Sequence, residues 1–230
     1  MDFLGIIIIL VKVLVVFAAT LLTVLMMVYA ERRVSAFMQG RLGPNRVGPQ
    51  GLLQPIADGI KFLMKEDIIP AGVDKPIFIL APAILLIPAL MTFAVIPFGS
   101  DITLFGRQIP LQVADVNIGI LYVLALTSIG LYGIVLAGWS SNSKYSLLGG
   151  LRSSAQLISY ELAMGLAVVS IILLSGSLKL NDIIADQQGY FFSWNVFKQP
   201  LAFLIFLVAV YAETNRLPFD LSEAEQELVG

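Results

Sequence analysis

Residues 3–30 read FLGIIIILVKVLVVFAATLLTVLMMVYA, and this run contains a single charged residue, Lys12. A helix of about 20 apolar residues crosses the hydrocarbon core of a bilayer. The run is too long for the apolar part of a signal peptide, and no basic segment precedes it. We therefore interpret residues 3–30 as a membrane span rather than as a cleavable leader.

The composition of the whole chain agrees with a membrane location. Of its 230 residues, 58% are hydrophobic and 13% are charged, against roughly half and a quarter in an average soluble domain. The net charge of −2 offers no basic surface for nucleic acid. Cysteine and histidine are both absent, which excludes disulfides, thiolate-held iron–sulfur clusters, histidine-bound haem, the usual zinc sites and Ser-His or Cys-His nucleophiles. A carboxylate site for a hard cation stays open, whereas an electron-carrying cofactor would have to lie on another chain.

Four further apolar runs follow the first one. They predict spans at about residues 76–98, 116–139, 155–175 and 194–212. The expected fold is an all-α integral membrane protein, with a bundle of five transmembrane helices in a single membrane domain over residues 1–230. Since the charged segment after residue 212 has no closing helix, we expect the chain to be a fragment of a longer protein.

The basic residues of the loops predict the orientation. Ten Lys and Arg residues fall on the side that follows spans one, three and five, and three fall on the other side. Cytoplasmic loops carry the excess of positive charge. The N-terminus is therefore expected outside.

The loop after the first span contains two features that suggest binding. Residues 41–51 read RLGPNRVGPQG, whose glycines and prolines predict a shaped, non-helical segment carrying Arg41 and Arg46. These arginines could face an anionic or carbonyl group, or could simply follow the positive-inside rule. Residues 51–65 predict an amphipathic helix, too short and too charged to span, lying in the cytoplasmic interface as a substrate wall or a partner-docking brace.

Acidic residues form the second pattern. Glu161 lies in an otherwise apolar span, about 9 Å below its expected cytoplasmic end at ~1.5 Å per residue. A carboxylate at that depth costs free energy unless it is paired, hydrated or neutral. Acidic residues in such positions are typical of proton relays. Glu31 and Glu213 are expected at similar depth, and Glu31 could instead pair with Arg32 or Arg33. After residue 212, five acids face one arginine: Glu213, Asp220, Glu223, Glu225 and Glu227, opposed by Arg216.

Three segments resemble one known family. They are ERRVSAFMQGRLGPNRVGPQGLLQPIADGIKFLMKED at residues 31–67, SAQLISYELAMG at 154–165 and AETNRLPFDLSEAEQELVG at 212–230. All three are similar to signature segments of the membrane-embedded H subunit (also numbered 1) of NADH-quinone oxidoreductase, respiratory complex I. The resemblance covers the whole chain in order and corresponds to the first five of about eight spans.

The resemblance implies a subunit that lines the quinone chamber and couples quinone reduction to proton translocation. It implies quinone as substrate, no covalently bound cofactor, no metal site and no catalytic residue in this chain, with flavin and iron–sulfur clusters on partner subunits. The implied partners are the other membrane-arm and peripheral-arm subunits and membrane lipid. By motif match, the quinone-binding residues are Glu31, Arg32, Gln39, Arg41 and Asp58. The proton-path residues are Glu161, Glu213, Arg216, Asp220, Glu223, Glu225 and Glu227.

Two other functions are compatible with parts of this pattern. One is the membrane subunit of an energy-converting hydrogenase, which shares parts of the Gly-Pro loop and of the acidic segment. The other is a secondary ion transporter that works alone, although no inverted repeat is apparent. The intact acidic segment favours NADH-quinone oxidoreductase, and we expect the bacterial cytoplasmic (inner) membrane rather than an organelle membrane.

Overall fold

The structure is a computed structural model that describes residues 3–104, 107–216 and 218–219. It divides into two compact units, Met1–Ile68 and Ile69–Gly230, which are treated separately below. The expectation of one membrane domain stays a prediction.

Four helices of the described residues are long and apolar enough to cross a membrane, which makes the chain a multi-pass membrane protein. They are Gly5–Met38, Lys75–Val95, Gly119–Ser140 and Lys144–Ser175. The predicted fifth span is shorter than expected. Its apolar helix has 14 residues and measures roughly 21 Å at 1.5 Å per residue, less than the ~30 Å of a hydrocarbon core.

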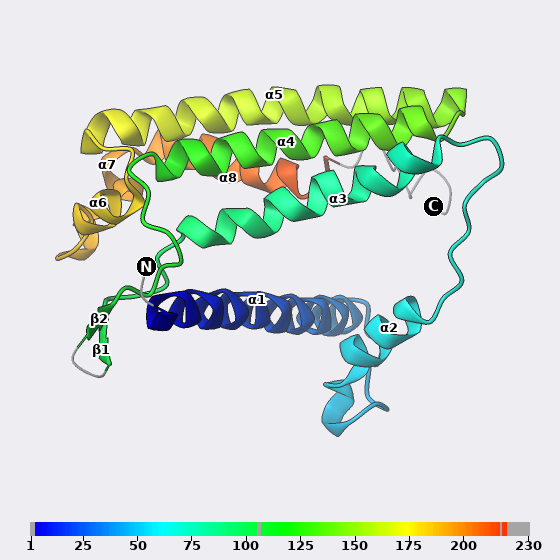
Figure 1. Cartoon of the computed structure of the whole chain (residues 1–230), viewed down its shortest axis with the longest axis horizontal. Helices are drawn as coiled ribbons and strands as arrows, with labels where there is room; N and C mark the ends of the chain where they lie inside the picture. Colours follow the sequence, from blue (N-terminus) through cyan, green and yellow to red (C-terminus); the bar gives the residue numbers. More distant parts are fainter. Residues whose placement is uncertain (1–2, 105–106, 217, 220–230) are drawn as a thin grey trace. The chain divides into compact units, whose positions relative to one another are not determined.

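The first unit consists of one long helix and a short one joined by a shaped loop (Figure 1). Its elements are α1 (Phe3–Met38), the single turn η1 (Pro49–Gly51) and α2 (Gln54–Leu63). Of the α1 side chains that the structure describes, only Ala36 is buried, as suits a helix whose apolar surface faces lipid.

Helix α1 continues eight residues beyond the predicted end at Ala30, because nothing in ERRVSAFM breaks a helix. It ends at Met38, and Gly40 just beyond it has φ +64°. The Gly40 amide donates to Phe37 O and the Arg41 amide donates to Ala36 O, at 3.1 and 2.9 Å. This is the Schellman pattern of helix termination, in which glycine supplies the left-handed residue.

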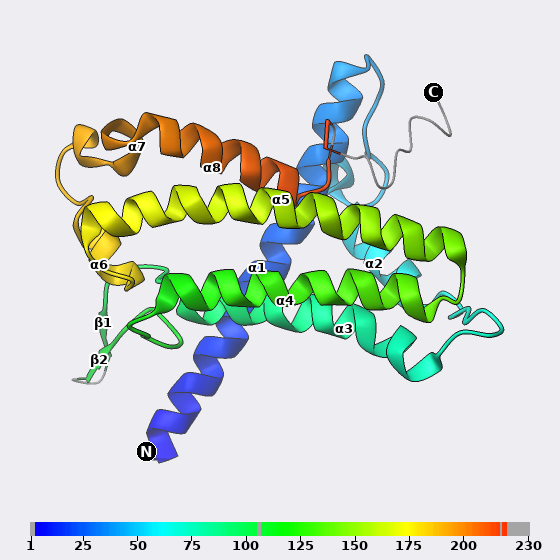
Figure 2. The ribbon, with the colours of Figure 1, turned by 90° about the horizontal axis from the view of Figure 1, so that it is seen from above.

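The second unit is built around four helices packed in the order α3, α4, α5 and α8 (Figure 2). Its elements are α3 (Lys75–Thr92), η2 (Phe93–Val95), β1 (Ile102–Leu104), β2 (Arg107–Ile109), α4 (Gly119–Ser140), α5 (Lys144–Ser175), α6 (Leu180–Ala185), η3 (Phe191–Ser193), α7 (Asn195–Lys198) and α8 (Pro200–Glu213). The strands β1 and β2 form an antiparallel hairpin, so the all-α expectation missed this small element between α3 and α4.

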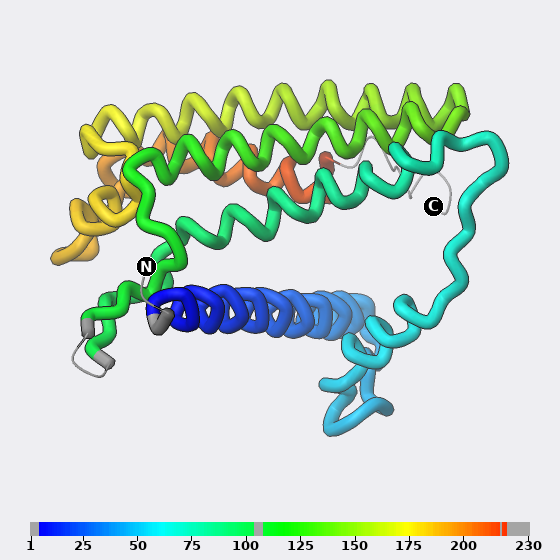
Figure 3. Tube along the Cα trace, in the orientation of Figure 1, coloured from blue at the N-terminus to red at the C-terminus, as the bar shows by residue number. Residues whose placement is uncertain are grey.

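The prediction of a loop between the third span and residue 155 is wrong. Figure 3 shows the chain leaving α4 through a short turn and entering α5 at once; the helix already begins at Lys144. Close packing explains the difference, because a Cβ on Gly138 would lie 2.9 Å from Ser146 O. Glycine at this position lets the backbones of α4 and α5 approach, and that contact outweighs the weak helix propensity of Gly149 and Gly150.

The predicted span 194–212 is interrupted near its start. Helix α7 ends at Lys198, Gln199 adopts φ −137° and ψ 67°, and Pro200 opens α8. Proline has no amide hydrogen to continue a helix from the preceding turn but suits the first helical position. The Gln199 side chain donates to Ser170 O on α5 at 3.1 Å and ties this break to the neighbouring helix.

Candidate functional site

Asp58 on α2 accepts hydrogen bonds from two sides. The Arg32 guanidinium on α1 donates to Asp58 Oδ2 in an ion pair, and Gln54 Nε2 donates to Asp58 Oδ1 at 3.0 Å. The bond from Arg32 and then the bond from Gln54 hold the pKa of Asp58 below its ordinary value. Asp58 is therefore ionised at neutral pH, and the partly exposed Arg32 presents its remaining N–H donors beside it.

A second set of contacts anchors the loop that precedes α2. Gln50 O accepts hydrogen bonds from Tyr29 Oη at 3.0 Å and from Arg33 Nη1 at 2.9 Å. Gln50 has φ +53° and Gly51 has φ +78°. A Cβ on Gly51 would clash with Pro44 O, so only glycine fits there. This anchor fixes the start of α2 and thereby the position of Asp58.

The predicted quinone-binding residues do not form one cluster in the first unit. Arg32 and Asp58 meet, whereas Gln39 and Arg41 form a separate contact in which Arg41 Nε donates to Gln39 Oε1 at 2.6 Å. Glu31 is an exposed residue of α1. Sequence reasoning missed Tyr29 and Gln50 and considered Arg33 only as a partner of Glu31; the i, i+4 spacing of Tyr29 and Arg33 on one helix was an available signal.

In the second unit, Glu161 on α5 faces α4. Ser128 Oγ donates to Glu161 Oε2 at 3.2 Å. Glu161 Oε1 is buried and has no hydrogen-bond partner among the described residues. A cavity of about 200 Å³ adjoins the carboxyl group, lined by Leu124, Thr127, Ser128, Ile158, Glu161, Leu162 and Gly165. The Glu161 carboxyl can therefore take up and release a proton in a largely apolar setting.

Glu213 ends α8, the other helix that packs on α5. Its Oε2 is also buried without a partner in the described part of the chain, and its carboxyl interacts electrostatically with that of Glu161. The two carboxyl groups therefore lie on helices that pack against each other, and each has one buried oxygen. The expected link to Glu31 lies between the two units and stays a prediction.

Only part of the predicted acidic segment is described. Asp220, Glu223, Glu225 and Glu227 lie outside the described residues, and Arg216 is exposed. Phe219, by contrast, is docked on the helices, since its carbonyl accepts from Gln156 Nε2 at 2.6 Å and its ring lies 5.3 Å from that of Tyr160. Sequence reasoning missed Ser128 and Gln156. Their polar side chains within apolar helices were an available signal.

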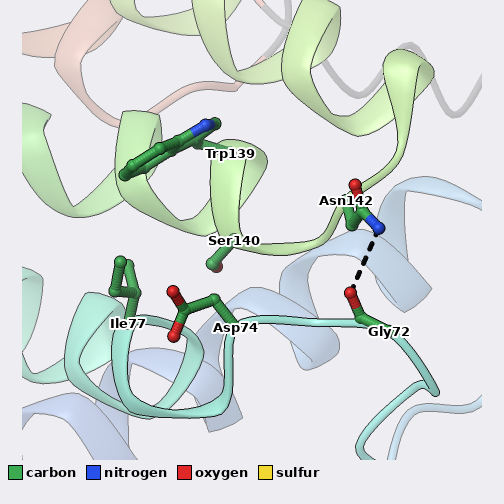
Figure 4. A pocket seen from close by; sticks show the side chains of 6 residues that line it. All are labelled: Gly72, Asp74, Ile77, Trp139, Ser140 and Asn142. Atoms are coloured by element: carbon green, nitrogen blue, oxygen red, sulfur yellow. Dashed lines mark hydrogen bonds between the residues drawn. The ribbon is translucent and has the colours of Figure 1, made fainter.

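Polar contacts also close the two ends of the helix layer. At one end Lys179 pairs with Asp115 at 2.7 Å, which raises the pKa of Lys179, and Asn181 Nδ2 donates to Gln112 Oε1 at 3.0 Å. At the other end Asn142 Nδ2 donates to Gly72 O at 3.2 Å beside a pocket of about 200 Å³ (Figure 4). No group of three acidic residues in the described part of the chain could hold a metal ion.

Comparison with known proteins decides the family. The profile of a family described as NADH dehydrogenase matches residues 11–230. The chain belongs to this family. It is 58% identical over 219 residues to the H 1 subunit of the NADH-quinone oxidoreductase of Geobacter metallireducens, a match that covers 95% of this chain and 66% of that protein.

Other members of the family give the same result. The H 2 subunit of the G. metallireducens enzyme is 60% identical over 230 residues, with 95% of this chain and 66% of that protein covered. The H 1 subunit of the Cytophaga hutchinsonii enzyme is 52% identical over 215 residues, with 94% and 62% covered. The chain thus spans somewhat less than two thirds of the length of these relatives.

Proposed function

We propose that this chain belongs to the membrane subunit that lines the quinone-access chamber of a proton-translocating NADH-quinone oxidoreductase and couples quinone reduction to proton movement. The observation that carries the proposal is the 58–60% identity to the H subunits of that complex. The multi-pass fold and the two polar sites support it. On this proposal the chain is part of an oxidoreductase complex but holds no redox cofactor itself.

The Arg32–Asp58 pair is the proposed centre of the quinone contact. A quinone headgroup has two carbonyl oxygens, which require donors, and Arg32 has N–H groups beyond those that bind Asp58. Asp58 holds the guanidinium in place, which orients those donors. Glu31, Gln39 and Arg41 are proposed to extend this polar wall, and the exposed apolar side chains of α2, such as Ile56 and Ile60, would contact the isoprenoid tail.

The buried carboxyl groups of the second unit are the proposed start of a proton path. Glu161 has a hydroxyl partner on one oxygen and a buried second oxygen, so it can accept a proton there without losing the Ser128 contact. Glu213 is the next carrier, because the two carboxyl groups interact. Arg216, Asp220, Glu223, Glu225 and Glu227 are proposed to continue this path toward the quinone chamber.

The placement in the cell follows from the same proposal. The chain would lie in a bacterial cytoplasmic (inner) membrane with its N-terminus outside, α2 in the cytoplasmic interface and the broken α7–α8 segment as the fifth crossing. Peripheral-arm subunits would supply the flavin and iron–sulfur clusters, other membrane-arm subunits would continue the proton path, and lipid would surround the apolar faces.

Copurification tests the proposal. The full-length protein is tagged and extracted in mild detergent, and the associated subunits, flavin and iron are measured together with NADH-driven quinone reduction. We expect a multi-subunit complex with inhibitor-sensitive activity. A hydrogenase complex without NADH oxidation, or a protein that purifies alone and moves ions, would contradict the proposal and favour one of the two alternatives.

A further inference from the structure

The side chain of Gln156 on α5 holds the chain that leaves α8. Gln156 Nε2 donates to Phe219 O at 2.6 Å, across 63 positions of sequence. The Phe219 ring sits edge-on to Tyr160 of α5 and Tyr211 of α8, with centroid distances of 5.3 and 6.2 Å. Phe219 therefore rests between the two helices that carry Glu161 and Glu213.

The orientation of the Gln156 amide follows from its partner. A backbone carbonyl only accepts hydrogen bonds, so the NH₂ end of the amide must face Phe219. The other end, Oε1, is buried and has no hydrogen-bond partner among the described residues. It shares this property with Glu161 Oε1 and Glu213 Oε2. A buried acceptor without a hydrogen bond costs free energy, so any conformation that brings a donor to it is stabilised.

We propose that Gln156 is a positioning residue for the chain segment that leaves the buried carboxyl groups at the end of α8. Its amide fixes the backbone of Phe219 against α5 and thereby fixes the short segment that connects Glu213 to the acidic residues beyond it. The proposal rests on the proposed function, because the consequence is expected in proton-coupled quinone reduction. Loss of the amide donor should release the segment while leaving both carboxyl groups in place.

A glutamate at position 156 gives the sharpest test. Protonated, the Gln156→Glu side chain can donate to Phe219 O; ionised, it can only accept and repels that oxygen. The titratable or charged groups on the packed elements are Lys144, Tyr145, Arg152, Tyr160 and Glu161 on α5, Tyr122 and Tyr132 on α4, Tyr211 and Glu213 on α8, and Arg216 after it. Coupled quinone reduction of Gln156→Glu should approach the wild-type rate at acidic pH and fall about fivefold below it at alkaline pH. Gln156→Met, of similar size without a donor, should be about fivefold slow at every pH.

Gln199 supplies a matched control. It also donates from Nε2 to a backbone carbonyl, Ser170 O, and also ties α5 to the α8 segment, but at the far end of both helices. Gln199→Glu and Gln199→Met should leave the pH profile parallel to that of the wild type. Each variant is made in the full-length protein and assayed in membranes normalised to assembled complex, with NADH oxidation by an artificial acceptor as the internal reference.

Hydrogen exchange provides a readout that does not depend on activity. The Phe219 amide donates to Arg216 O at 2.7 Å, and this turn should loosen when its carbonyl tether is lost. A peptide covering residues 211–219 should exchange about fivefold faster in Gln156→Met than in Gln199→Met. Equal exchange in the two variants, or a Gln156→Glu profile parallel to the wild type, overturns the inference. Absence of NADH-driven quinone reduction by the wild-type complex would instead overturn the proposed function, and the exchange experiment would still test the tether.

Discussion

Ser128 on α4 and Glu161 on α5 are joined across the helix interface by a hydrogen bond of 3.2 Å. The same hydroxyl lies 3.0 Å from Leu124 O in its own helix. A serine hydroxyl has one proton to donate but can also accept. Its proton can therefore serve an ionised Glu161 or return to Leu124 O when Glu161 is protonated and donates in its turn. The contact suits a carboxyl group that changes its protonation state.

The first prediction concerns Glu161 itself. Glu161→Gln keeps the shape of the side chain and can still accept from Ser128, so the complex should assemble normally. Because the amide cannot titrate, proton pumping and quinone reduction should fall about a hundredfold, the low end of what positioned acid–base groups contribute. The measurement is NADH-driven proton uptake into vesicles at matched complex content. Wild-type rates would remove Glu161 from any obligatory path.

The second prediction concerns Ser128. Ser128→Ala removes one partner of Glu161 and should slow coupled turnover by about twofold to fivefold, as loss of a single hydrogen bond suggests. Thr127→Val is the control, because Thr127 lines the same cavity but donates to Leu124 O of its own helix, at 2.9 Å. The prediction fails if both variants slow the reaction equally.

The third prediction concerns Asp58. Asp58→Asn should raise the KM for a short-chain quinone by up to about fivefold, the range that an exposed ion pair allows. Oxidation of NADH by an artificial acceptor should not change. Lys65→Gln, at the end of the predicted amphipathic segment 51–65, serves as control. An equal fall of the artificial-acceptor rate per complex would indicate an assembly defect rather than a quinone-site defect.

The pH dependence of the same pair has a defined sign. The bonds from Arg32 and Gln54 lower the pKa of Asp58 in the folded state. The stabilisation that Asp58 provides is therefore fully present when the pH is above its pKa in the unfolded chain. It is lost only as the pH falls through the lower pKa that Asp58 has in the folded protein. Carbon-13 NMR of the labelled carboxyl should show no titration in the neutral or mildly acidic range, and Arg32→Gln should move the titration to higher pH.

The fourth prediction concerns Gly51. Gly51→Ala places a methyl group against Pro44 O at a residue with φ +78°, and should destabilise the loop by about 1–3 kcal/mol. Gly59→Ala in α2 is the matched control, since nothing lies within 4 Å of its Cβ position. That change should stabilise the helix by about 0.5–1 kcal/mol. The temperature at which the peripheral arm dissociates is compared between the two variants. Equal temperatures would contradict the conclusion that only glycine fits at position 51.

Hydropathy alone predicted the main helices, because a bilayer requires continuous apolar runs. Their ends were less predictable. Glu31 and Arg32 resembled a loop after a span, yet they continue α1, since charged residues form helices readily. Lys144–Ser154 resembled a loop because of its glycines, but packing against α4 makes it helical. The β1–β2 hairpin has three-residue strands, too short for a periodic signal.

The candidate sites were predicted in part. The acids were recognisable because each stands out in an apolar setting, and the Arg32–Asp58 contact joins two residues assigned to one site. The partners Ser128 and Gln156 were not recognisable, because they acquire roles only through contacts with segments distant in sequence. A polar residue on a helix gives no indication of which neighbour it will meet until the packing order is known.

The unbroken helix α1 has a mechanical consequence. Its 36 residues measure roughly 54 Å at 1.5 Å per residue, well beyond the ~30 Å of a hydrocarbon core. Tyr29, Arg32 and Arg33 thus belong to the same stiff rod as the lipid-facing apolar turns, with no hinge between them. A change in bilayer thickness that tilts the rod would swing these side chains and, through Gln50 and Asp58, the loop and helix attached to them. The lipid composition of the membrane thereby becomes a determinant of the geometry of this polar site.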